Sequence, residues 1–99
     1  MTDRKWQRAI VERDDICQIG QLLGKNCMVV PTTGHHIIHR RYKKTRHDLR
    51  NGIGLCPVCH NWAHSNPEES RKKIIDVLID NGVIENIEEF EAMELMARR

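Results

Sequence analysis

The sequence predicts a small α+β fold, in which two short strands and a helix form the centre and further helices flank them. The chain has 99 residues, which is enough for one domain. Apolar side chains recur at helical spacing near both ends, whereas the middle holds short segments that suit strands. All six histidines lie in this middle part, between residues 35 and 64. The centre of the fold is therefore also the place to look for chemistry.

The N-terminal third begins with a predicted helix over residues 4–13. Trp6, Ala9, Ile10 and Arg13 follow each other at a spacing of three and four, as on one face of a helix. The glycines at positions 20 and 24 then predict turns. A short strand is expected over residues 27–30, ended by Pro31.

The middle of the chain predicts two strands, over residues 35–39 and 52–56, joined by the long basic loop RRYKKTRHDLR. A helical pattern follows from Val58 to His64. The segment Ser65-Asn66-Pro67-Glu68-Glu69 starts a new helix, because it offers a cap, a proline in the first turn and acidic side chains near the helix N-terminus. We expect residues 1–66 to form the functional domain and residues 67–99 to form a helical extension.

The C-terminal extension is expected to hold two helices. Asn81-Gly82 predicts the end of the first, and the second follows Asn86. Phe90, Met93 and Ala97 share one face of this last helix and are interpreted as packing residues.

Composition favours a cytoplasmic protein that contains metal. No run approaches the roughly 20 apolar residues of a membrane span, and the charged N-terminus MTDRKWQRAIVERDD has no apolar segment typical of a signal peptide. Thiols stay reduced in the cytoplasm, so the four cysteines point to metal binding rather than to disulfides. A small domain with four aromatic residues also gains stability from such a site.

The charge distribution predicts a polyanion as a partner, and no membrane contact is expected. Residues 35–66 hold six basic residues and one acidic residue, whereas residues 67–99 hold five basic and nine acidic ones. A basic centre of this kind suits a local polyanion site, although a solvated basic loop is the alternative. The candidates for contact with the phosphates of such a polyanion are Arg40, Arg46 and Arg50.

The histidines suggest a catalytic metal site. His60 and His64 are four residues apart, which places both imidazoles on one face of a helix within reach of one ion. His35 and His36 are adjacent, so on a strand their side chains point to opposite sides and one of them is free for another task. A free imidazole with a pKa near 6.5 suits a general base. His39 and His47 receive no role.

The segment HHIIHRRYKKTRHDLRNGIGLCPVCHNWAH, from His35 to His64, resembles the His-Asn-His (HNH) nuclease motif, with Asn51 between the paired histidines and the helix. The phrases WQRAIVERDDICQ and TRHDLRNGIGLCPVCHNWAHSNP are similar to small stand-alone HNH proteins of phages and bacteria. This resemblance implies a ββα-metal (His-Me finger) core with flanking N- and C-terminal helices. It also implies a metal-dependent DNA endonuclease.

The resemblance also implies a role for each motif residue. His36 would be the general base, Asn51 would orient it through hydrogen bonds to the backbone, and His35, His60 and His64 would be the metal ligands. Many relatives have aspartate at the position of His35, and histidine there matches a colicin-like variant. A nitrogen-rich site suits Mg, Mn, Ni or Zn, so the metal stays open.

The cysteines predict a structural zinc site of Cys17, Cys27, Cys56 and Cys59. Cys56-Pro-Val-Cys59 has the spacing of a zinc knuckle just before a helix. Gly20 stands where a second CxxC would place its partner thiol, so four buried free thiols are the alternative. A Cys2His2 finger is rejected, because no residues separate the cysteine pair from the histidine pair.

Two functions remain in competition at this stage. One is the endonuclease, which would nick or cut DNA; the other is a zinc-stapled DNA-binding or packaging accessory module without significant cleavage. The acidic C-terminal helices would mediate a homodimer or dock on a phage packaging partner. A general base such as His36 has a use only in the first.

Overall fold

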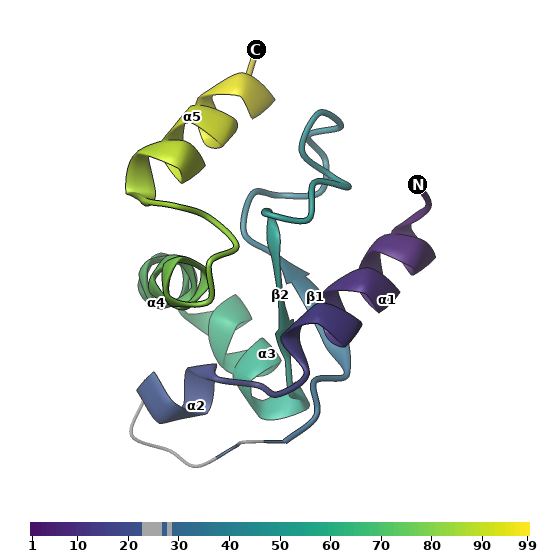
Figure 1. Cartoon of the computed structure of the whole chain (residues 1–99), viewed down its shortest axis with the longest axis vertical. Helices are drawn as coiled ribbons and strands as arrows, with labels where there is room; N and C mark the ends of the chain where they lie inside the picture. The colour runs from purple at the N-terminus through teal and green to yellow at the C-terminus, as the bar shows by residue number, and fades with distance from the viewer. Residues whose placement is uncertain (23–26, 28) are drawn as a thin grey trace.

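The computed structural model describes residues 1–22, 27 and 29–99, and in this part of the chain five helices surround one two-stranded sheet (Figure 1). Strands β1 (Thr33–His36) and β2 (Gly52–Leu55) pair antiparallel, with Thr33 opposite Leu55 and His36 opposite Gly52. The predicted α+β fold is confirmed. No helix in the described ranges is long and apolar enough to cross a membrane.

Helix α1 (Asp3–Asp14) covers one face of the hairpin. Its N-cap is Thr2, whose hydroxyl accepts from the Lys5 N–H, and its C-cap is Asp15, which has a positive φ of 57°. Trp6 and Ile10, one turn apart, are fully buried against the strands.

Glycines on the strands allow this close approach. A Cβ built on Gly52 would lie 2.4 Å from Cζ2 of Trp6, and one on Gly34 would lie 3.0 Å from Cζ3 of the same ring. Any side chain at Gly52 would therefore displace the indole. The third glycine on this face, Gly54, leaves room for Pro31.

The other face of the hairpin packs on α3 (Pro57–Ser65). The apolar core on this side also includes residues of α2 (Ile19–Leu22), α4 (Pro67–Asp80) and α5 (Ile87–Ala97). Ile53 and Leu55 of β2 point into this core. The same apolar cluster includes Ile74 of α4 and Phe90 of α5, and thus residues from both sides of position 66. The division into two domains stays a prediction.

The predicted helices agree closely with the observed ones. The N-terminal helix extends one residue beyond the prediction at each end, and α4 stops at the Asn81-Gly82 signal, where Gly82 has φ of 73°. Asn86 caps α5 by accepting from the Glu89 N–H. Asn66 precedes α4 as predicted, but its side chain donates to the Trp62 carbonyl at the end of α3 and makes no capping bond.

Two predictions in the N-terminal third were wrong. The turn expected at Gly20 is part of helix α2, and Gly24 lies outside the described residues. Residues 27, 29 and 30 form no strand, since the Val29 carbonyl accepts from the Cys17 N–H and holds this segment away from the hairpin; Met28 lies outside the described residues.

The first strand of the hairpin is displaced toward the N-terminus. It was predicted over residues 35–39 and ends instead at His36. The Ile38 N–H donates to the Asn51 side chain rather than to a strand, so the ladder cannot continue.

Candidate active site

Three imidazoles converge where β1 meets α3. His35 belongs to β1, and His60 and His64 lie one turn apart on α3. One ring nitrogen of each lies within 4.8 Å of the others. The ring centroids of His35 are 5.5 Å from His60 and 5.2 Å from His64. The spacing HxxxH and the strand position of His35 thus bring together the three residues expected as ligands.

The donor set of this histidine cluster fits a divalent cation. Nε2 of His60 and Nε2 of His64 are 3.0 Å apart, a distance at which two lone pairs repel unless a proton or a cation lies between them. Zn–N bonds of about 2.0–2.1 Å place the nitrogens that share one ion roughly 3–4 Å apart. Burial, together with the charges of His60 and His64, lowers the pKa of His35 to about 4. The ring is therefore in the neutral form that binds metals.

His36 points to the opposite face of the strand, toward α1. Its ring stacks on Trp6, with centroids 3.8 Å apart and planes 7° from parallel. Nε2 of His36 lies 2.8 Å from the Arg46 carbonyl oxygen. Because a carbonyl only accepts, Nε2 carries the proton and Nδ1 keeps its lone pair. Burial lowers the pKa of His36, which also favours the neutral ring.

Asn51 is fully buried at the end of the loop between the strands. Its Oδ1 accepts from the Ile38 N–H at 2.7 Å, and its Nδ2 donates to the carbonyls of Ile38 and Thr45, both at 3.1 Å. One side chain thus satisfies three backbone groups in a loop without strands or helices. These bonds fix the loop that carries the Arg46 carbonyl.

A pocket of about 280 Å³ joins these groups. It is lined by both histidines of β1, by His60 and His64 of α3, and by Arg40. A second pocket of about 210 Å³ shares His35, His36 and His64 and extends along α4 to Arg71. Although His35 and His36 leave the strand on opposite faces, both therefore border one space open to solvent.

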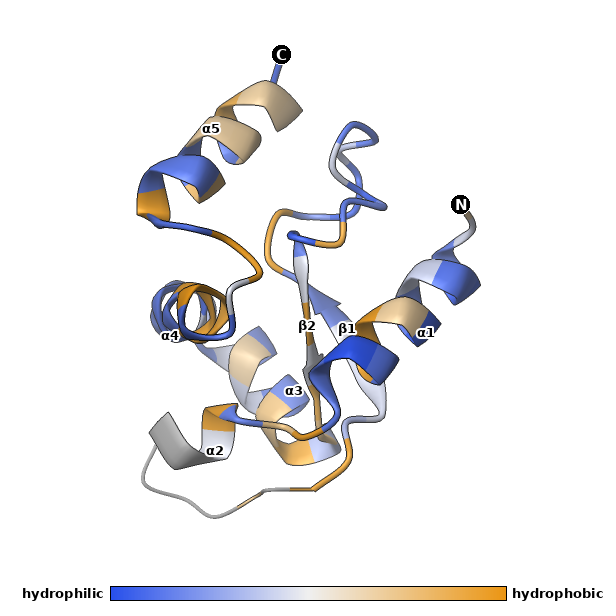
Figure 2. Ribbon diagram, viewed as in Figure 1, coloured by the Kyte–Doolittle hydropathy of each residue, from blue (hydrophilic) through white to orange (hydrophobic). Residues whose placement is uncertain are grey.

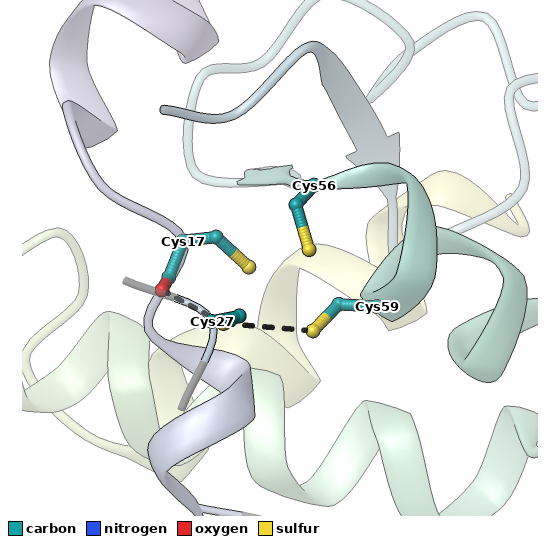
Figure 3. A group of neighbouring side chains, drawn as sticks. All are labelled: Cys17, Cys27, Cys56 and Cys59. Atoms are coloured by element: carbon teal, nitrogen blue, oxygen red, sulfur yellow. Dashed lines mark hydrogen bonds between the residues drawn. The ribbon is translucent and has the colours of Figure 1, made fainter. Parts of the chain in front are cut away.

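The four cysteines form a second cluster, at the N-terminal end of α3 (Figure 3). All four sulfur atoms lie within 4.8 Å of one another. Cys17 follows α1, Cys56 caps α3 and Cys59 lies in its first turn. Cys27 completes the cluster, and its thiol donates to the Cys17 carbonyl at 3.2 Å.

The cysteine cluster could hold one zinc ion. Four converging thiols are the donor set of structural zinc sites. Burial raises the pKa of Cys17 and of Cys59. Burial also acts to raise the pKa of Cys56, but the N–H groups of Cys59 and Val58 at the start of α3 hold it below its usual value. A cation at the centre would stabilise the thiolates that burial disfavours.

Comparison with known proteins agrees with this geometry. The family model described as HNH endonuclease matches residues 17–66, which is half of the chain. The chain belongs to the HNH endonuclease family. The search of curated proteins and the search of solved structures found no match.

Family membership indicates nuclease activity at the level of the family and a divalent metal in the site. The matched range contains the histidine and cysteine clusters and Asn51, whereas α1 lies before it.

The three arginines expected to contact phosphate differ in their surroundings. Arg40 is exposed, borders the pocket and has no carboxylate within ion-pair distance among the described residues. Arg46 binds Asp3, and Arg50 binds both Asp48 and Glu89. The polar loop that carries all three stands out from the apolar core in Figure 2.

Two residues beside the HNH motif were missed as parts of the site. Trp6 was assigned only to a helix face, yet it stacks on His36. Asp3 received no role, yet its carboxylate accepts from Arg46 and from Nε2 of His47. The spacing of Asp3 and Trp6, three residues apart on one helix, shows that they share a face but not what that face contacts.

Proposed function

We propose that this HNH protein is a metal-dependent DNA endonuclease that hydrolyses phosphodiester bonds, with His36 as general base. The observation that carries the proposal is the pocket bordered both by the histidine cluster and by His36. Metal ligands alone would suit a structural site. A neutral imidazole held beside them, outside the ligand set, is useful only if a proton has to be moved.

The proposal gives each residue of the site a separate role in hydrolysis. A divalent ion held by His35, His60 and His64 would stabilise negative charge on the phosphate as a Lewis acid. His36 accepts the proton of the attacking water at Nδ1, since its Nε2 proton is already given to the Arg46 carbonyl. Asn51 keeps the loop that carries this carbonyl in place. Arg40 is the arginine best placed to bind the DNA backbone beside the pocket.

The cysteine cluster has a structural role in this proposal. Zinc held by the four thiols would tie the segment around Cys17 to helix α3, and so stabilise the small domain around the site. DNA is the proposed substrate because the loop between the strands is basic. Partners of the acidic C-terminal helices, either a second copy or a packaging component, are proposed on charge alone.

Cleavage of supercoiled plasmid tests the function. The chain is supplied with Mg, Mn, Ni or Zn in turn, with EDTA and the variant His36→Ala as controls. We expect nicking or linearisation that needs metal and falls at least about 100-fold in His36→Ala, which is the lower end of what one general base contributes. His36→Ala should bind as much metal as the wild type, because His36 is outside the ligand set.

Two results would contradict the proposal. Retained turnover in His36→Ala would remove its role as base. Failure to cleave with any of the four metals, combined with retardation of DNA on a gel, would favour the DNA-binding accessory module.

A further inference from the structure

Helix α1 lies outside the residues matched to the family, yet it makes polar contacts along the whole hairpin. The Gln7 side chain donates to the Gly34 carbonyl at 2.9 Å and accepts from the N–H of the same residue. Arg13 donates to the Gly52 carbonyl at 2.7 Å, and Asp14 accepts from the Gly54 N–H at 2.6 Å. The helix therefore fixes both strands through their backbones.

The N-terminal end of α1 reaches further, to the loop that holds the general base. Trp6 covers one side of the His36 ring, and its Nε1 donates to the Asp48 carbonyl at 3.1 Å. The hydrogen bond from Nε2 of His36 to the Arg46 carbonyl fixes the orientation of the same ring. Position and protonation of His36 thus depend on residues 46–48, which belong to no strand or helix.

Asp3 binds the side chains of this same segment, residues 46–48, on its exposed side. Its carboxylate accepts from Nε of Arg46 at 2.9 Å, from Nη2 of the same guanidinium, and from Nε2 of His47 at 2.6 Å. The bonds to Arg46 and His47 keep the pKa of Asp3 well below its usual range. Asn51 holds the preceding residue, Thr45, from inside the fold. The Arg46 carbonyl is therefore fixed by neighbours on both sides.

The exposure of this ion pair decides between a structural and a positioning role. The side chains of Asp3 and Arg46 are 43% and 32% exposed. Ion pairs between side chains as exposed as these contribute little to stability, because water and salt screen the charges. Loss of the Asp3 charge should therefore barely affect folding, while it releases the residue whose carbonyl orients the base.

We propose that Asp3 is a positioning residue for His36, acting through Arg46. The inference rests on the proposed nuclease function and extends its machinery to a helix outside the matched HNH region. Arg46 then orients His36 through its backbone carbonyl, while the ion pair between its guanidinium and Asp3 fixes the position of that carbonyl. The competing role for this guanidinium is contact with a DNA phosphate.

Steady-state cleavage by Asp3→Asn separates the two roles. Positioning predicts that kcat falls about tenfold while KM for DNA stays within twofold, because substrate binding is unchanged but the base is misplaced. Asp3→Glu, which restores a carboxylate, should recover most of kcat. Glu69→Gln is the matched control, since it removes an exposed first-turn carboxylate from α4 and should leave both constants unchanged.

A readout independent of activity comes from the nitrogen chemical shifts of the histidine rings in the zinc-loaded chain. We expect His36 to carry its proton on Nε2 in the wild type, and to exchange between both ring forms in Asp3→Asn. Should Asp3→Asn not fold, Arg46→Gln breaks the same pair from the other side and should reproduce the fall in kcat.

The outcomes distinguish this inference from the proposed function. A wild type that cleaves and an Asp3→Asn variant with unchanged kcat and unchanged His36 signals would overturn the role of Asp3 alone. A lower KM with unchanged kcat would assign the released Arg46 to phosphate binding and also overturn it. A wild type without any cleavage would instead overturn the nuclease function, whatever the ring signals show.

Discussion

The cysteine cluster and the histidine cluster both include residues of helix α3, but they differ in what surrounds them. Three of the four cysteines are at most 3% exposed, and the cluster joins segments from distant parts of the chain. The histidine cluster offers three ligands, one of them exposed, beside a pocket. Four ligands and a closed surround are typical of structural zinc, whereas three ligands and an open side are typical of catalytic metal. Loss of metal should therefore harm stability at one site and chemistry at the other.

The largest effect is expected at the cysteine cluster. Cys59→Ser removes one of four ligands from a buried site, and the binding energy of structural zinc is largely folding energy in small domains. We expect either no cooperative unfolding transition or a Tm lower by at least about 15 °C, which corresponds to several kcal/mol in a domain of this size. Circular dichroism melts combined with zinc analysis measure this.

The matched control for Cys59→Ser is Val58→Ser, a change at the preceding, exposed residue of α3. It should alter stability by about 0.5 kcal/mol or less, as surface substitutions usually do. If Cys59→Ser kept the Tm and the zinc content of the wild type, the four residues would be free thiols.

The opposite pattern is expected for His60→Ala. Its ring is half-buried at the edge of a pocket that is open to solvent, so its loss should shift Tm by no more than about 5 °C, or roughly 1 kcal/mol. Cleavage should fall at least about 100-fold, because one of three metal ligands is missing. Asn61→Ala, at the neighbouring exposed position, is the control. Equal losses of stability in His60→Ala and Cys59→Ser would contradict the distinction between the two clusters.

Much of this contrast could be predicted from local sequence patterns. The i, i+4 spacing of His60 and His64 places two imidazoles on one helix face, and alternation along a strand separates His35 from His36. The CxxC before α3 indicates half of the cysteine cluster. These features depend on residues that are close in sequence, and for such residues the geometry of a helix or strand determines which way each side chain points.

The remaining features depend on contacts between distant residues. Asp3 meets Arg46, and Trp6 meets His36, across 43 and 30 positions, and no periodicity reports such pairs. The ladder ends at His36 because Asn51 replaces a strand as the partner of Ile38. The segment at Val29 follows Cys17 rather than the hairpin for a similar reason. In each case a tertiary hydrogen bond overrides the local preference of the segment.

The smallest expected effect concerns two arginines that differ, as the two clusters do, in how closed their surroundings are. Arg50 has its charge satisfied inside the fold by Asp48 and Glu89, whereas Arg40 borders the pocket without such a partner in the described part of the chain. Arg40→Ala should raise KM for DNA about three- to tenfold and reduce the salt dependence of binding by about one phosphate contact. Arg50→Ala should leave KM within twofold and lower stability by about 1 kcal/mol at most, since its side chain is 42% exposed. Fluorescence anisotropy with a labelled duplex at several salt concentrations measures both. Equal salt slopes in the two variants would show that ion pairing inside the fold does not decide which arginines bind DNA.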